Sequence, residues 1–316
     1  MGITKFPAGI SSQGVPVIGG SYYTTGTVFF VDSTTGSNGN SGTDKDHPFS
    51  TIDYAIGRCT GDKGDVIIVM PNHTETVTSA TALALDVAGI NIIGLGSAGT
   101  RPLITLTTAT TASINVDADD ITLKNFRIDL TGVDAVALGI DVNAAGFTME
   151  DCDIEVDDTG GQAVLAMDIA GVDNVTVRHC CFHGIGSSAH SPVATHAINV
   201  SATGCDFLTI EDNYFSGWFL TAVMAATKDA EGMLIQNNVF INWSDTGAAI
   251  IDLGSTTTSV YGAVRYNDFS TNSSGTWTTV VVGDVLGKTS AVENYVTHFG
   301  QGKSGALAPE LTEAHG

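Results

Sequence analysis

The chain has 316 residues, of which 43% are hydrophobic, and its 34 acidic residues outnumber its 12 Lys and Arg residues to give a formal net charge of -22. This balance argues against nucleic acid as a partner, because phosphate binding needs a footprint of Lys and Arg, and it disfavours anionic membranes for the same reason. No stretch reaches the roughly 18 uncharged apolar residues of a membrane span, and the N-terminus lacks the basic start and apolar run of a secretory signal. We therefore expect synthesis in a reducing cytoplasm, where the five cysteines, an odd number, remain thiols.

Residues 1–25 read MGITKFPAGISSQGVPVIGGSYYTT and follow neither a helical nor a strand period. They are too apolar for a solvated tail, and an extended apolar segment can bind along a groove or a sheet edge of another protein. The pattern predicts an extended arm that anchors the chain to a partner. Its candidate anchor residues are Ile3, Phe6, Pro7, Ile10, Val15 and Pro16. An arm that folds back onto its own chain is the alternative.

Residues 26–77 are expected to form the N-terminal end of the folded part. A strand over 28–31 leads into a loop rich in Gly, Ser and Asn, and Pro48 then opens a short helix. One face of this helix carries Ile52, Ala55, Ile56 and Cys59. The segment GDVIIVMP follows as the first buried strand. An amphipathic helix at this place can cap a stack of β-strands, whose unpaired edge would otherwise recruit other chains.

An eight-residue unit recurs without gaps in residues 78–300. Its copies are ITLKNFRI from Ile121, FTMEDCDI from Phe147, VTVRHCCF from Val175, LTIEDNYF from Leu208, MLIQNNVF from Met233 and GAVRYNDF from Gly262. They begin 26, 28, 33, 25 and 29 residues apart, the period of a β-helix turn with loops of variable length. A looser strand precedes several units, as in SINV, GIDV, AMDI and AINV. The repeat predicts an all-β fold, a right-handed parallel β-helix formed by one chain, with residues 301–316 as a C-terminal tail.

The face to which side chains point changes inside each unit. Positions one and three are apolar, as in a half-buried strand, whereas positions six and eight are the selective ones in the second half. Because a flat strand cannot change this parity, the chain must turn a corner at positions four and five. Position six then forms a ladder beside the corner, composed of Cys152, Cys180, Asn213, Asn238 and Asn267. Position eight forms a core stack of Ile128, Ile154, Phe182, Phe215, Phe240 and Phe269.

The segment VTVRHCCFHG raises a metal alternative. Alternation places His179, Cys181 and His183 on one side of a strand, and these residue types bind zinc. Ligands in line on a strand lie about 6.5 Å apart and converge poorly on one ion, so we favour a structural role and predict no metal or other cofactor. Stacking also brings Cys152 and Cys180 together, but parallel side chains and a reducing compartment favour two thiols over a disulfide.

Two segments carry a resemblance to a known family. FVDSTTGSNGNSGTDKDHPFSTIDYAI and GDVIIVMPNHTETV resemble the N-terminal cap of pectin-lyase-like β-helix proteins, and the chain to about Phe299 is similar to β-helix proteins encoded by tailed bacteriophages. Residues 1–25 resemble leader segments of phage virion proteins. The resemblance implies a non-enzymatic structural protein of the virion, made in the host cytoplasm. It would be a homotrimeric decoration or head-fibre protein attached to the capsid or another virion protein through its arm.

Two other functions stay open, a tail-associated spike that binds a receptor or degrades polysaccharide, and a free polysaccharide lyase. Such catalysis needs clustered carboxylates, often with calcium, beside an Arg or Lys. The acidic runs DADD (117–120) and DD (157–158) lie in loops and are expected to be solvated, with calcium binding as the alternative. A polyanionic rod would also repel a polyanionic glycan. We therefore predict no catalytic residue.

Three tryptophans bear on a further partner. They are Trp218, Trp243 and Trp277. Their rings fit either the packing of loops and subunits or a platform for sugar rings, so a glycan stays open as a partner.

Overall fold

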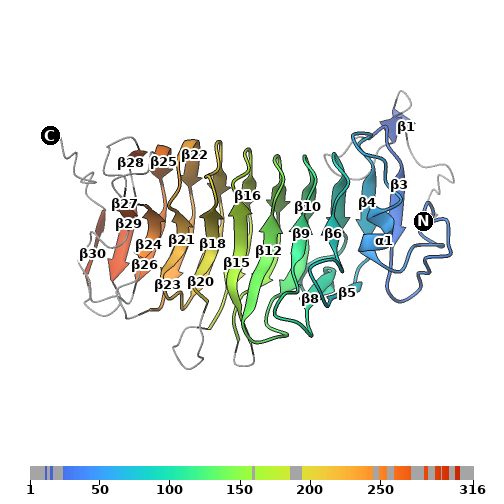
Figure 1. The fold of residues 1–316 in the computed structure, drawn as a ribbon, viewed down its shortest axis with the longest axis horizontal. Coiled ribbons are helices and arrows are strands. Elements are labelled where there is room, and N and C mark those ends of the chain that lie inside the picture. The colour runs from blue at the N-terminus through green and yellow to red at the C-terminus, as the bar shows by residue number, and fades with distance from the viewer. Residues whose placement is uncertain are drawn as a thin grey trace, which may run out of the picture.

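The computed structural model describes residues 11–12, 15–16, 24–158, 161–185, 194–244, 249–254, 260–271, 281–283, 289–292, 294–298 and 303–306. From residue 24 onward the described chain winds into three sheets whose strands stack along the long axis of a rod, and β1 and β2 form a separate two-stranded sheet (Figure 1). The parallel β-helix predicted from the repeat is confirmed. No helix in the described part of the chain is long and apolar enough to cross a membrane.

Sheet I contains the first strand of each eight-residue unit, and its ten strands pair in parallel. In chain order they are β3 (Val28–Val31), β4 (Val66–Val69), β7 (Asn91–Gly94), β10 (Thr122–Lys124), β13 (Thr148–Glu150), β16 (Thr176–Arg178), β19 (Thr209–Glu211), β22 (Ala230–Gln236), β25 (Val260–Arg265) and β28 (Thr289–Val292).

Sheet II contains the second strand of each unit. Its ten strands are β5 (Thr74–Val77), β8 (Leu103–Leu106), β11 (Arg127–Asp129), β14 (Asp153–Glu155), β17 (Cys181–His183), β20 (Tyr214–Gly217), β23 (Val239–Asn242), β26 (Asp268–Thr271), β29 (Tyr295–His298) and β30 (Lys303–Ala306).

Sheet III contains the looser strands that precede the units. Its eight strands are β6 (Ala84–Leu85), β9 (Ile114–Val116), β12 (Val136–Val142), β15 (Ala163–Ala170), β18 (His196–Ser201), β21 (Ala222–Ala226), β24 (Ala249–Leu253) and β27 (Val281–Gly283). A 3-10 turn, η1 (Ala98–Thr100), lies in the loop between β7 and β8.

The corner between sheets I and II turns on a single left-handed residue. All six residues at position five have φ between 53° and 64°, namely Asn125, Asp151, His179, Asp212, Asn237 and Tyr266. Asn, Asp and His tolerate this region better than other residues with a side chain. The left-handed residue changes the parity of the chain, so positions three, six and eight all point inward.

The interior is a continuous apolar core that runs from Phe29 to Phe269. The rings at position eight stack on one another. Their centroids are 5.0 Å apart between Phe182 and Phe215, 4.7 Å between Phe215 and Phe240, and 5.4 Å between Phe240 and Phe269. Ile128 and Ile154 continue this file toward the N-terminus, where they pair in register and are buried.

The helix α1 (Ile52–Ile56) packs on the N-terminal end of this core through Ile52, Ala55 and Ile56. It begins later than predicted. Thr51, not Pro48, precedes its first turn, and the Thr51 hydroxyl accepts a hydrogen bond from the Tyr54 backbone N–H. This cap satisfies a backbone donor that proline ahead of the helix could not satisfy.

Both termini differ from a simple arm and tail. The described part of the arm pairs β1 (Ser11–Ser12) with β2 (Val15–Pro16) in antiparallel fashion, so it turns back on itself rather than running straight. The anchor candidates Val15 and Pro16 lie in β2, and Ile3, Phe6, Pro7 and Ile10 fall outside the described residues. In the predicted tail, β30 adds an antiparallel strand to β29 and covers the edge of sheet II.

Candidate functional site

The ladder at position six joins successive turns through buried side chains. Asn238 donates a hydrogen bond from Nδ2 to the carbonyl oxygen of Ile210 at 2.9 Å, and its Oδ1 accepts one from the backbone N–H of Asn213 at 2.9 Å. Its Nδ2 also lies 3.0 Å from Oδ1 of Asn267. Asn213 and Asn267 repeat this geometry in their own turns. Each asparagine therefore satisfies a corner amide and a corner carbonyl of the turn before it.

Cysteines take the same place in two turns. The Sγ atoms of Cys152 and Cys180 lie 3.8 and 3.7 Å from the position-three carbonyl oxygens of the preceding turn, Leu123 and Met149. The backbone N–H of Cys180 bonds to Oδ1 of Asn213 at 2.9 Å, which links the cysteine and asparagine parts of the ladder. Burial raises the pKa of the Cys180 thiol well above its ordinary value. Both cysteines are free.

The ladder extends one turn beyond the predicted set. Asn294 is 3% exposed, donates from Nδ2 to the carbonyl oxygen of Val264 at 2.9 Å, and accepts from the backbone N–H of Asn267 at 3.0 Å. Its unit, TSAVENYV, starts with Thr and ends with Val, so the apolar and aromatic pattern did not reveal it. The spacing of 27 residues from Asn267 is the signal that could have found it.

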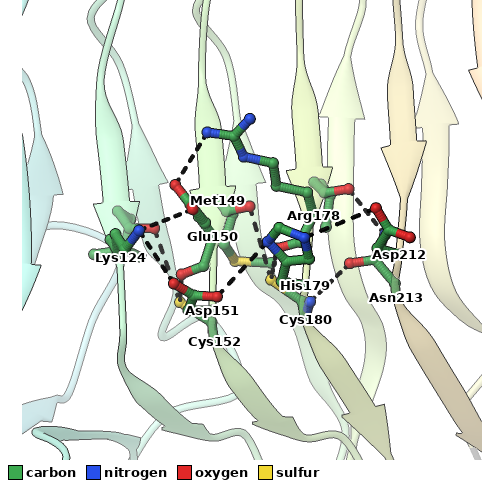
Figure 2. A network of polar contacts seen from close by, with 12 residues as sticks. Lys124, Met149, Glu150, Asp151, Cys152, Arg178, His179, Cys180, Asp212 and Asn213 are labelled. Atoms are coloured by element: carbon green, nitrogen blue, oxygen red, sulfur yellow. Dashed lines mark hydrogen bonds and ion pairs between the residues drawn. The ribbon is translucent and has the colours of Figure 1, made fainter. Parts of the chain in front are cut away.

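On the outer side of the corner, ion pairs join residues of successive turns (Figure 2). The Glu150 carboxylate lies between Lys124 Nζ at 2.8 Å and Arg178 at 3.1 Å, both in neighbouring turns. Burial alone would raise the pKa of Glu150, but the hydrogen bonds and charges of Lys124 and Arg178 outweigh it, so the pKa lies below its ordinary value. All three residues occupy position four of their units, where the side chains of Lys124 and Glu150 are 22% and 12% exposed.

His179 lies between two carboxylates at the left-handed position. Its Nδ1 is 3.8 Å from Asp151 and its Nε2 is 3.8 Å from Asp212. Among the described residues, a metal-like cluster occurs at Glu150, Asp151 and His179, whose ligand atoms lie within 4.8 Å of one another. Lys124 lies 3.1 Å from Asp151 and 2.8 Å from Glu150, and Arg178 lies 3.1 Å from Glu150, so two positive charges already face the two carboxylates. This arrangement suits ion pairing between turns better than a cation site.

The zinc candidates do not converge. His183 directs Nε2 to Asp153 at 3.0 Å, and the hydrogen bond to that carboxylate raises the pKa of His183. Burial raises the pKa of Cys181 to about 11, which keeps it a thiol. Asp153 also binds Arg101 at 3.0 Å, a residue that sequence reasoning missed because it lies in the irregular loop between β7 and β8.

A second polar row follows the outer face of sheet III. In-register positions on successive strands hold Asn115, Asp141, Asp168, Asn199, Ala225 and Asp252. Asp168 is only 6% exposed and accepts hydrogen bonds from Asn199 Nδ2 at 2.6 Å and Ser201 Oγ at 2.7 Å. Burial raises the pKa of Asp141, and the carboxylates of Asp168 and Asp117 raise it further against a hydrogen bond from Asn143.

The residues of this row occupy a regular position in the sequence, to which we assigned no role. The third letters of SINV, GIDV, AMDI and AINV are the Asn and Asp residues that the sheet brings into line. Chemically, the row places Asp141, a carboxyl group with a raised pKa, beside the hydrogen-bonded carboxylate of Asp168. That pairing is suited to proton transfer, because a general acid needs a pKa closer to the working pH.

The loop acids and tryptophans lie in different surroundings. Asp117 accepts from Asn143 and Asp119 from the Ala145 backbone, on the exposed side of the rod. Asp157 is buried at 3% exposure, contrary to the prediction of a solvated loop acid, because the loop folds onto Gly184 of the next turn. Trp218 is buried, Trp243 is half-buried, and Trp277 falls outside the described residues.

No protein-family model and no curated protein sequence matches the chain. Solved structures of similar fold include a rhamnogalacturonan lyase, with 13% identity, a TM-score of 0.46 and coverage of 78% of this chain and 74% of that one. A pectin methylesterase from carrot has 14% identity, a TM-score of 0.43 and coverage of 88% and 85%. The tailspike protein of E. coli bacteriophage HK620 has 9% identity, a TM-score of 0.38 and coverage of 76% and 49%. At these identities the likeness concerns the fold alone.

Proposed function

We propose that the chain is a non-enzymatic structural protein of a bacteriophage particle, a decoration or head-fibre rod that attaches to the capsid through residues 1–25. The observation that supports this proposal most is that polar side chains along the corner bond to residues of other turns. Asn238 and its equivalents and Glu150 bond to residues of neighbouring turns. Asp153 bonds to His183 of the next turn and to Arg101 two turns before it. Such contacts stabilise the stack rather than present chemistry to a substrate.

A rod of this kind is suited to a surface exposed to mechanical and chemical stress. Strand hydrogen bonds hold each turn to the next. From Cys152 onward the buried ladder adds to them, and from Phe182 to Phe269 the ring stack does so as well. In a linear repeat, stability comes from these contacts between neighbours. At the N-terminal end α1 packs on the core, and at the C-terminal end β30 pairs with β29 and so covers that edge of sheet II.

The test is to locate the protein on purified particles and to delete residues 1–20. Phage lacking the gene would be complemented with the full chain or the deleted chain, and incorporation would be measured by quantitative mass spectrometry of gradient-purified virions. We expect the deleted chain to keep its β-sheet circular dichroism and its melting temperature, and to be lost from the particle. Equal incorporation of both chains would refute attachment through the arm, and absence of the full chain from virions would refute the virion role.

Polysaccharide cleavage on the outer face of sheet III is a second candidate function, favoured by the pairing of Asp141 with Asp168. One carboxyl group has a raised pKa and the other accepts two hydrogen bonds. The test is release of reducing or unsaturated sugar ends from host capsular polysaccharide by the wild type, Asp141→Asn and Asp168→Asn. Loss of about 1,000-fold or more in either variant would support catalysis, because removal of an acid or base costs typically 10²–10⁴ in rate. No release by the wild type would exclude it.

A further inference from the structure

The outer face of sheet II changes character halfway along the rod. On β11, β14 and β17, the outward positions seven and nine hold mostly charged or ionisable groups, namely Arg127, Asp129, Asp153, Glu155, Cys181 and His183. On β20, β23, β26 and β29, position seven holds Tyr214, Val239, Asp268 and Tyr295, and position nine holds the uncharged residues Ser216, Ile241, Ser270 and Thr297, so Asp268 is the one carboxylate among them. These four strands lie side by side toward the C-terminal end of the rod (Figure 1). The change is notable in a chain of net charge -22.

We define the aromatic face as Tyr214, Val239, Ile241, Trp243, Asp268 and Tyr295. In position seven, the register runs Tyr214, Val239, Asp268, Tyr295 across four successive strands. Tyr214 is 42% exposed and Tyr295 is 46% exposed, so both rings are accessible. The Trp243 indole N–H donates to Ser216 Oγ at 3.2 Å, which fixes the indole across the neighbouring strand.

We propose that the aromatic face binds a neutral glycan. The exposed Tyr rings and the half-buried Trp243 ring offer flat apolar surface with a polar edge, which matches a sugar ring, whose faces are apolar and whose rim carries hydroxyl groups. The exposed carboxylate of Asp268 lies between Val239 and Tyr295 in the register, where it can accept hydrogen bonds from sugar hydroxyls. A few placed polar groups among aromatic side chains are the usual composition of a small-molecule site.

Size and charge favour a glycan over the other occupants. The face spans three strand spacings and about four residues, which gives an area on the order of 200 Å². A stable subunit interface buries about 800 Å² on each partner, so the face is too small to hold a second copy by itself. The net charge of -22 repels a polyanionic glycan at long range, which favours an uncharged glycan over an acidic one.

The experiment is affinity gel electrophoresis of the full chain through gels that contain dextran, mannan, galactan or polygalacturonate, followed by tryptophan-fluorescence titration with a hexasaccharide of the retarding polymer. We expect retardation by at least one neutral polymer and none by polygalacturonate. Tyr214→Ala, Tyr295→Ala and Asp268→Asn should each weaken the apparent affinity at least tenfold. Tyr261→Ala is the matched control, because Tyr261 is a tyrosine of similar exposure, 39%, on sheet I.

Three outcomes would overturn the proposal. The first is no retardation by any neutral polymer in the panel. The second is retardation that is equal in the wild type and the three variants of the aromatic face. The third is a wild-type oligomer, measured by light scattering, that Tyr214→Ala dissociates, since the face would then be a subunit contact. Unchanged melting temperatures of the variants would show that the comparison is between folded proteins.

Discussion

Replacement of Asn238 by Ala tests whether the buried ladder holds the turns together. The substitution removes the hydrogen bonds of Nδ2 to Ile210 and Asn267, and those that Oδ1 accepts from Asn213. It leaves the Asn213 backbone N–H and the Ile210 carbonyl oxygen buried without these partners. Asn238 is 1% exposed, so water cannot replace the lost partners without entering the core.

The magnitude follows from the bonds lost. A hydrogen bond contributes about 0.5–1.5 kcal/mol net, and a buried group left unsatisfied costs about 1–3 kcal/mol. Two backbone groups left unsatisfied, the Asn213 N–H and the Ile210 carbonyl, together give a loss of roughly 2–6 kcal/mol in the free energy of unfolding. Asn238→Cys should lose less, because Cys152 and Cys180 show that a thiol can still approach the same carbonyl oxygen. Asn238→Asp should lose most, since it buries a charge beside the Ile210 carbonyl oxygen.

Guanidinium unfolding and hydrogen exchange together measure this loss. The Asn213 amide should exchange faster by a factor that corresponds to the measured loss of stability, whereas amides several turns away should change less, because coupling in a repeat runs between neighbours. Asn143→Ala is the matched control, since Asn143 is exposed and its side chain donates to Asp117 of the preceding turn, away from the buried ladder. A loss below about 1 kcal/mol in Asn238→Ala, or an equal loss in Asn143→Ala, would refute the reasoning.

Three further predictions concern single sites. Cys180→Asn should raise stability by about 1 kcal/mol, because an amide oxygen there could accept from the Cys152 backbone as Asn213 accepts from Cys180; a lower unfolding midpoint would count against this. Gln162→Leu should stabilise the protein by about 1–3 kcal/mol, since Gln162 is fully buried and neither of its amide atoms has a partner among the described residues. An unchanged or lower unfolding midpoint of the variant would contradict this. His183→Gln should destabilise most between the unfolded-state pKa values of 3.8 for Asp153 and 6.5 for His183. The raised pKa of His183 stabilises the fold fully below pH 6.5, and this stabilisation is lost as the pH rises through the folded-state pKa. The lowered pKa of Asp153 stabilises the fold above pH 3.8, and this stabilisation is lost as the pH falls through the folded-state pKa. A stability difference between variant and wild type that stays constant between pH 4 and 9 would contradict this pairing.

The fold was predictable because its constraints repeat. Positions one, three, six and eight face the interior in every turn, so each position is sampled six times and the pattern survives variation in loop length. The change of parity required a corner, and the structure turns that corner with a left-handed residue such as Asn125 or Asp212. A single strand-like segment would not have shown this, because alternation by itself does not reveal where a chain bends.

The positions that face away from the core show no such repeating pattern, so their contacts could not be predicted from the sequence. Arg101 reaches Asp153 across 52 residues because the loop between β7 and β8 carries it to the corner, and nothing in the local sequence fixes that path. The register of sheet III is needed to show that Asp141 and Asp168 lie side by side. The aromatic face likewise depends on the register of β20 with β29, through two intervening strands. Register between turns is a property of the stack, so pairs formed across it cannot be read from one segment.

Because inward and outward side chains have different roles, the functional experiments can distinguish a loss of binding from a loss of folding. The ladder and the ring stack, which hold the turns together, consist of buried side chains such as Asn238 and Phe240. Tyr214, Asp268 and Tyr295 are exposed and contribute little to that stack, and surface substitutions usually change stability by less than about 0.5 kcal/mol. A loss of glycan binding in these variants therefore reports the surface itself. Asp168 is different, since it is buried among Asn199 and Ser201, and a change of activity in Asp168→Asn must be read against its melting temperature. Of the two proposed surfaces, the aromatic face thus gives the cleaner test.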